Sequence, residues 1–185
     1  MSSMPSCCDW KLSDILKKLI TNTAELDVEK IIHIILQLLS FFILIGCLVA
    51  DQWLSGETGY QGLWNVCYTN ETSSCCGKLD DVIGYKDFIG ATRAFLIIES
   101  LLFLAIFYTI YKTVYKDDPV YVASTFLTGF IGFCTFLSIT IYGARHDDVS
   151  KINMSTMKLS VSYIFCTLNL GLQIIIGVFG LFLIQ

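Results

Sequence analysis

The chain has 185 residues, of which 55% are hydrophobic and only 15% charged, and its mean hydropathy is +0.67. A soluble domain of this size needs more charge to cover its surface, so the composition predicts a protein whose solvent is a lipid bilayer. The net charge of −4 excludes the basic surface of a nucleic-acid-binding protein. With two histidines there is little material for a metal site or for acid–base catalysis, and we expect no metal, no cofactor and no enzyme activity.

Residues 1–30 precede the first apolar run and are predicted to contain a short amphipathic helix. Its two faces are Leu12, Ile15, Leu16, Leu19 and Ile20 on the apolar side and Lys11, Asp14, Lys17 and Lys18 on the polar side. Such a helix suits the surface of a membrane leaflet. Cys7 and Cys8 lie just before it and are candidates for palmitoylation. A loosely ordered tail with reduced thiols is the equal alternative.

Four apolar stretches follow, at about 31–50, 89–111, 120–144 and 159–185. Each is long enough to cross a hydrocarbon core of about 30 Å, which takes roughly 20 helical residues. Lipid cannot satisfy the backbone groups of an open strand, so the stretches are predicted to be helices. The predicted fold is therefore an all-α membrane protein, a bundle of four transmembrane helices.

The first loop between these helices, residues 51–88, is predicted to form a small antiparallel sheet. Leu63, Trp64, Val66 and Tyr68 include the aromatic and β-branched types that favour strands, and a polar turn follows at 69–74. Cys67 and Cys76 can then face each other across a hairpin, although Cys75 lies next to Cys76. A bridge would contribute roughly 2–3 kcal/mol. Trp53, taken alone, is interpreted as a residue of the interfacial aromatic belt.

Orientation is predicted from the same loop, because Lys and Arg are divided almost evenly between the two sides of the membrane. Asn70-Glu71-Thr72 is a glycosylation sequon beside the loop cysteines. A sequon and closely spaced cysteines suit an oxidising space outside the cytoplasm. We therefore expect the loops 51–88 and 145–158 to be extracellular, Asn70 to be glycosylated, and both termini to be cytoplasmic.

Two charged residues fall inside the second apolar stretch. Glu99 lies about two turns within it, where an ionisable group is costly unless it is paired or hydrated. We expect it to be protonated or hydrogen-bonded to Asn169, Gln173 or Ser138, with a functional role as the alternative. Arg93 lies near the interface and is expected to brace the sheet against the helices.

In the third stretch Ser124, Thr128 and Gly132 form a stripe of small residues at four-residue spacing. The stripe predicts close helix packing within the bundle, with lateral association of two copies as the alternative.

The order Trp53, Gly62-Leu63-Trp64, Cys67 and Cys76 resembles the signature of the superfamily that holds claudins, peripheral myelin protein, epithelial membrane proteins and calcium-channel gamma subunits. The resemblance implies a claudin-like fold over residues 31–185. It places Arg93 at the family's arginine position, and the 17-residue separation of Arg93 from Cys76 implies that Cys76 rather than Cys75 bridges to Cys67. The ten residues between Trp53 and Trp64 are similar to the short spacing of the myelin and epithelial branch.

The resemblance also implies a function. The expected role is a non-enzymatic plasma-membrane protein that organises cell–cell contacts or junctional membrane through the disulfide-closed first loop. The alternatives are a claudin-like paracellular barrier or cation channel, favoured by a loop net charge of −4, and an auxiliary subunit of an ion channel or receptor. Expected partners are the bilayer, a second copy or other membrane proteins. No PDZ scaffold is expected, because the fourth apolar stretch runs to residue 185.

Overall fold

The structure is a computed structural model that describes residues 28–70, 73–83, 87–116, 121–150 and 157–183. The predicted amphipathic helix, with Cys7 and Cys8, lies outside the described residues. Of the sequon, the backbone of Asn70 is described and residues 71–72 are not.

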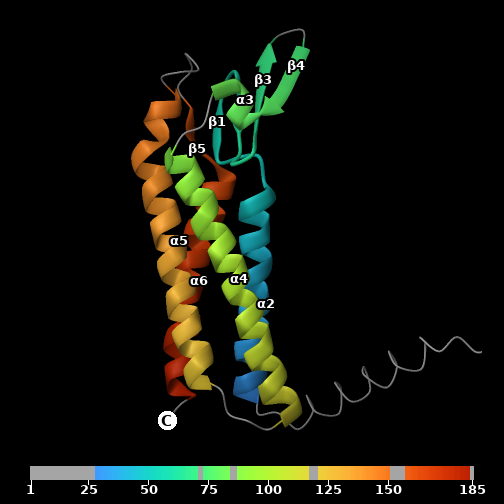
Figure 1. Cartoon of the computed structure of the whole chain (residues 1–185), viewed down its shortest axis with the longest axis vertical. Helices are drawn as coiled ribbons and strands as arrows, with labels where there is room; N and C mark the ends of the chain where they lie inside the picture. The colour runs from blue at the N-terminus through green and yellow to red at the C-terminus, as the bar shows by residue number, and fades with distance from the viewer. Residues whose placement is uncertain (1–27, 71–72, 84–86, 117–120, 151–156, 184–185) are drawn as a thin grey trace, which may run out of the picture.

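Four long helices form the body of the molecule: α2 (Val28–Val49), α4 (Asp87–Lys116), α5 (Tyr121–Ser150) and α6 (Val161–Phe182). Each is long and apolar enough to cross a membrane. Contacts of α2 with α4, α4 with α5, α5 with α6 and α6 with α2 close a ring, as Figure 1 shows. The predicted four-helix bundle is confirmed.

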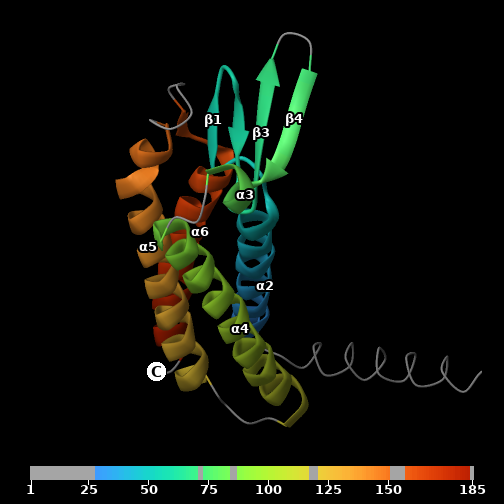
Figure 2. The same cartoon turned by 45° about the horizontal axis from the view of Figure 1, so that its top comes forward.

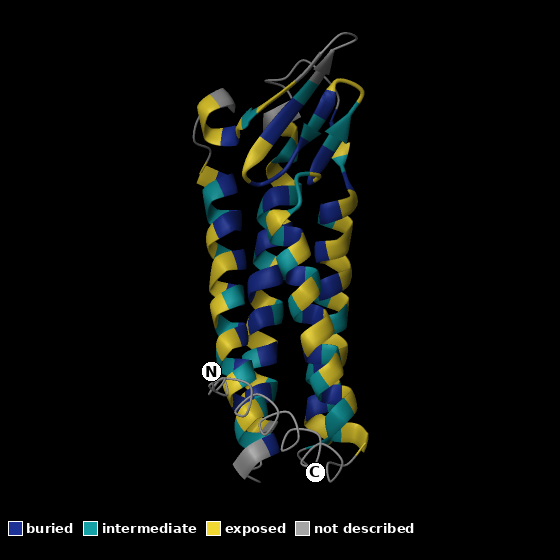
Figure 3. Ribbon diagram, turned by 90° about the vertical axis from the view of Figure 1, so that its right-hand side faces the viewer, coloured by how far each residue is buried: buried dark blue, intermediate teal, exposed yellow. Residues whose placement is uncertain are grey.

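The helices turn apolar side chains outward and many of their polar side chains inward. Large side chains on the outer faces, such as Phe42, Leu101 and Phe126, are 60–77% exposed. Buried positions inside the ring include Gln37, Glu99 and Asn169, each fully buried. Figure 3 shows exposed residues along the outward faces of the helices. This distribution fits lipid as the surrounding solvent.

Helix boundaries differ from the predicted ones, most clearly in the second and third transmembrane helices. The second begins at Asp87 and reaches Lys116, beyond the predicted 89–111, and the third continues to Ser150 rather than 144. Hydropathy marks where lipid contact ends, whereas intrahelical hydrogen bonds continue through polar residues such as Arg145. The first six residues of the predicted second loop, 145–150, are therefore helical.

A five-stranded antiparallel sheet stands at one end of the bundle, as Figure 2 shows. Its strands are β1 (Leu54–Gly56), β2 (Gly59–Gln61), β3 (Asn65–Asn70), β4 (Ser73–Lys78) and β5 (Lys158–Leu159), in the spatial order β4-β3-β2-β1-β5. The predicted sheet is confirmed. A short helix that was not predicted, α3 (Leu79–Ile83), follows β4.

Strand β5 comes from the second loop and pairs with β1, with Leu159 opposite Leu54. It shortens the fourth helix, which begins at Val161 instead of the predicted 159. The first helix begins at Val28 rather than 31.

Candidate functional site: the sheet–helix junction

The sheet rests on the helices through one set of contacts, which we call the sheet–helix junction: Trp53, Leu63, Trp64, Asp80, Arg93 and the last turn of α2. Just after α2, the backbone of Ala50 and Asp51 passes very close to the backbone of Gly62. A Cβ atom on Gly62 would lie 2.6 Å from the Cα of Asp51 and 2.9 Å from the carbonyl oxygen of Ala50. Only glycine fits there, which explains its place in the motif.

Two tryptophans hold the end of α2. The indole nitrogen of Trp53 donates to the Cys47 carbonyl oxygen at 2.8 Å, and that of Trp64 donates to the Leu48 carbonyl oxygen at 2.7 Å. The last carbonyl groups of a helix have no partner within the helix. The two indoles therefore cap α2 and fix the first strands to it.

Trp53 is fully buried, so its interpretation as an interfacial belt residue is wrong. Its ring packs against Tyr142 of α5 and Tyr163 of α6, with centroids 4.7 and 6.1 Å away. Its backbone bonds both to Gln61 and to Ser160 at the start of α6. Burial of the ring under the sheet, between two helices that lie far from Trp53 in the sequence, outweighs any preference of its indole for headgroups.

Arg93 lies at the centre of the junction. Its Nε and Nη2 donate to the Leu63 carbonyl oxygen at 2.9 and 2.6 Å, and Nη1 and Nη2 donate to the two Asp80 carboxylate oxygens at 2.9 and 3.0 Å. The guanidinium carbon lies 4.8 Å from the centroid of the Trp64 ring. These contacts match the planar fork of arginine, which lysine cannot reproduce. The hydrogen bonds from Arg93 hold the pKa of Asp80 below its usual value.

The outer part of the sheet is closed by a disulfide between Cys67 of β3 and Cys76 of β4, which face each other in the strand register. Cys75 is exposed and carries a free thiol in the monomer. Asn70 ends β3 at the tip of this hairpin, opposite Ser73. The motif residues thus converge on the sheet and its base.

Glu99 lies apart from the junction, inside the bundle. It is fully buried, and neither carboxylate oxygen has a hydrogen bond of normal geometry in the described part of the chain, because the neighbouring Thr135 hydroxyl donates to the Ile131 carbonyl oxygen instead. The expected bonds to Asn169, Gln173 or Ser138 are therefore not present. Asn169 accepts a hydrogen bond from Ser40 instead, and Gln173 donates one to the same Ser40 hydroxyl.

The small-residue stripe also faces the interior. Thr128 is fully buried and accepts a hydrogen bond from Gln37 of α2, while Ser124 is 5% exposed. Gly132 packs against Gln173 of α6, because a Cβ atom there would lie 3.5 Å from the Gln173 Cβ. The stripe therefore packs within the bundle, as the first of its two readings predicted.

Sequence reasoning missed two members of this region. Asp80 was counted only as a loop charge, and Tyr142 was not recognised as a partner of Trp53. Tyr142 also lies 3.4 Å from the Gln61 side-chain nitrogen, which donates to its hydroxyl. A signal existed for Asp80, since a buried arginine near a membrane surface requires an acidic partner, but several loop acids could have supplied it.

A family model described as the PMP-22/EMP/MP20/Claudin family matches residues 28–180. The match begins at the start of α2, covers the whole sheet and ends two residues before the end of α6. A comparison with curated proteins found no match.

Proposed function

Because this chain belongs to the PMP-22/EMP/MP20/Claudin family of membrane proteins, we propose that it organises cell–cell contacts or junctional membrane at the plasma membrane. It does so without enzyme activity, through the sheet closed by Cys67 and Cys76. The sheet faces the extracellular space and both termini face the cytoplasm.

The observation that carries this proposal is the open edge of β4. Among the described residues β4 has only β3 as a neighbouring strand, and the β3–β4 hairpin extends away from the four helices (Figure 2). The backbone groups along an open edge can pair with a strand of another molecule. A second copy of the chain or another membrane protein can therefore bind here.

The junction supports this role because it makes the hairpin a firm extension of the membrane helices. Arg93, Trp53 and Trp64 connect the base of the sheet to α2, α4 and, through Tyr142, to α5. A contact made by β4 is thereby transmitted to the bundle rather than absorbed by a flexible loop.

The experiment is to express the tagged protein in confluent epithelium in which only some cells carry it. Enrichment at borders between two expressing cells, relative to borders with non-expressing cells, supports a contact role. The variant Cys67→Ser with Cys76→Ser opens the hairpin and should abolish this enrichment. Cys75→Ser, on the same strand, is the matched control and should retain it.

Surface biotinylation must accompany the imaging, so that loss of enrichment is scored only on protein that reaches the cell surface. Uniform distribution of the wild-type protein over all cell borders contradicts the proposal. Removal of N-glycans should lower the apparent mass unless Asn70 is replaced by Gln, which tests the orientation separately.

A cation-selective paracellular channel is the second candidate, favoured by exposed carboxylates at Glu57, Asp81 and Asp87. Such charges attract cations. If these carboxylates line a pore, Asp81→Lys should lower the preference of the pore for cations over anions. Dilution potentials across a monolayer measure this preference. Asp80 is unsuitable for this test, because its reversal breaks the bond to Arg93.

A further inference from the structure

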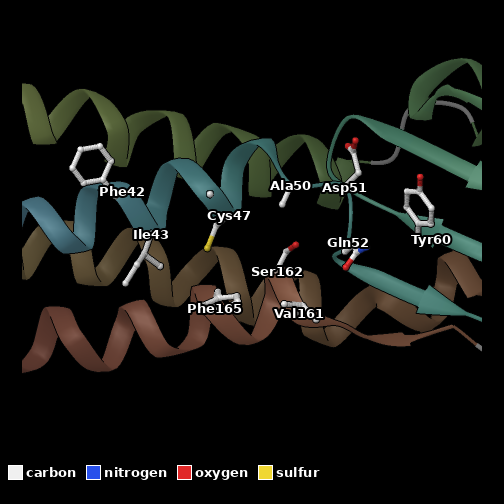
Figure 4. Close-up of a pocket in the computed structure, with 11 residues that line it drawn as sticks. Phe42, Ile43, Cys47, Ala50, Asp51, Gln52, Tyr60, Val161, Ser162 and Phe165 are labelled. Atoms are coloured by element: carbon white, nitrogen blue, oxygen red, sulfur yellow. The ribbon is translucent and has the colours of Figure 1, made fainter.

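A cavity of about 700 Å³ lies between α2 and α6 at the end of the bundle that carries the sheet. Its lining includes Phe42 and Ile43 of α2 and Phe165 and Val161 of α6, which Figure 4 labels on the two helices, with Asp51 and Tyr60 beyond the end of α2. We call it the α2–α6 groove. It is open at the side, where the helices face lipid.

The lower part of the α2–α6 groove is apolar. Phe42 and Phe165 are 67% and 50% exposed, and Gly46 leaves the wall between them without a side chain. From Phe42 to Ala50 the helix rises by about 12 Å. That depth is close to half of a hydrocarbon core of about 30 Å, so the groove matches the thickness of one membrane leaflet.

The part of the α2–α6 groove next to the sheet is polar, and it begins just after the end of α2. Asp51 contributes a carboxylate, of which one oxygen accepts a hydrogen bond from the Asn65 side chain at 3.2 Å. Tyr60 of β2 contributes an aromatic ring. A carboxylate together with an aromatic ring is the combination that binds a quaternary ammonium group.

The third polar group is Ser162, in the first turn of α6. Ser162 is 4% exposed and lines the groove, and the structure gives its hydroxyl no hydrogen bond with any described residue. The start of a helix carries a partial positive charge that favours phosphate. A buried hydroxyl donor at that position suits the phosphodiester of a lipid.

We propose that the α2–α6 groove binds one phospholipid with a choline headgroup from the leaflet on the sheet side. An acyl chain lies along Phe42, Gly46 and Phe165, the phosphate accepts a hydrogen bond from the Ser162 hydroxyl, and the ammonium group lies against Asp51 and Tyr60. An anionic lipid without the ammonium group would place its charge near the Asp51 carboxylate. A sterol would leave the phosphate position empty. This inference does not depend on the proposed contact function.

The test uses the full-length protein purified in detergent and exchanged into each of three lipids: dioleoylphosphatidylcholine, dioleoylphosphatidylglycerol and cholesterol. Bound lipid is counted by native mass spectrometry, and thermal stability is measured in parallel, because a ligand that binds the folded state raises it. The wild-type protein should retain one phosphatidylcholine and should be stabilised by it more than by either of the other two lipids.

The deciding variant is Gly46→Phe, which fills the groove. A Cβ atom at Gly46 would meet nothing within 4 Å, so the added ring displaces lipid and not protein. The matched control is Gly171→Phe on α6, where a Cβ atom also meets nothing within 4 Å and which does not line the groove. Affinity for phosphatidylcholine should fall by at least about tenfold in Gly46→Phe and stay unchanged in Gly171→Phe.

Asp51→Asn provides a second readout. It keeps the size of the side chain and removes the charge. The difference in affinity between phosphatidylcholine and phosphatidylglycerol should therefore become smaller. The proposal is overturned if Gly46→Phe retains phosphatidylcholine as the wild-type protein does. It is equally overturned if phosphatidylglycerol or cholesterol binds the wild-type groove as tightly as phosphatidylcholine.

Discussion

The sheet–helix junction and the interior of the bundle both bury polar groups, but they treat them differently. At the junction the five side-chain nitrogen donors of Trp53, Trp64 and Arg93 all have acceptors at 2.6–3.0 Å. In the interior, by contrast, the oxygens of Glu99 and atoms of several other polar side chains have no partner among the described residues. Hydrogen bonds thus fix the side-chain positions at the junction, whereas the interior of the bundle accommodates polar atoms that have no described hydrogen bond.

The first prediction tests whether the junction carries the stability. Trp53→Ala removes a fully buried ring and the cap on Cys47, and should lower the free energy of unfolding by about 3–5 kcal/mol. Unfolding in detergent micelles, followed by circular dichroism, measures it. Phe126→Ala, at a side chain that is 77% exposed to lipid, is the control and should change stability far less. Equal losses of stability in Trp53→Ala and Phe126→Ala would contradict the prediction that the junction carries the stability.

The second prediction concerns Arg93. Arg93→Met keeps an unbranched, though shorter, side chain but leaves the buried Leu63 carbonyl oxygen without its two donors, which should cost about 2–3 kcal/mol. The same unfolding assay checks this. Arg93→Lys should recover only part of the loss, because an ammonium group cannot form the forked contacts to Leu63 and Asp80 at once. Full recovery of stability in Arg93→Lys would show that the positive charge, and not the forked geometry, accounts for the contribution of Arg93.

The third prediction has the opposite sign and applies to the interior. Glu99→Met replaces a buried carboxyl group that has no described hydrogen bond with an apolar side chain of similar size. The free energy of unfolding should rise by about 1–2 kcal/mol. A lower melting temperature for Glu99→Met would instead show that the carboxyl group has a stabilising partner, and the contrast between the two regions would fail.

The smallest expected effect is the pH dependence of the Asp80–Arg93 pair. Because the pKa of Asp80 is lowered in the folded protein, its contribution is complete above the ordinary aspartate pKa of about 3.9 and is lost as the pH falls through the folded value. The Asp80 side chain is 49% exposed, so the contribution should be about 0.5 kcal/mol or less.

Melting temperatures of the wild-type protein and Asp80→Asn should therefore differ at pH 7 and converge below about pH 4. Asp81→Asn, at the exposed neighbouring residue, is the control and should show no such convergence. A difference in melting temperature that does not shrink at all as the pH is lowered through this acidic range would mean that Asp80 acts through packing rather than through its charge.

Much of this architecture follows from the sequence because two strong signals coincide. Apolar runs of about 20 residues or more define the four helices, and the spacing of Trp53, Leu63, Cys67 and Cys76 defines the sheet beside them. Helix ends were less predictable. Hydropathy stops at the membrane surface, whereas α5 continues through Arg145 to Ser150 and α6 loses its first residues to β5.

The partners within the junction were the least predictable part. Trp53 lies beside Tyr142 only because α5 and α6 bring their ends together under the sheet. Asp80 reaches Arg93 because α3 turns the chain after β4, and nothing in the local sequence distinguishes Asp80 from Asp81. Glu99 was recognised as unusual, but its surroundings depend on which faces of four helices meet.

The pairing of β5 with β1 sets an order of events during synthesis. The first loop is made about a hundred residues before Lys158 and Leu159, yet β1 lacks its outer neighbour until they arrive. Until then β1 is an unprotected strand edge, a form that invites wrong partners. The backbone bonds from Ser160 to Trp53 and from Ser162 to Gln52 also wait for that moment. The sheet is therefore completed only when residues 158–162 have been made, and a chain that ends before them exposes the edge of β1.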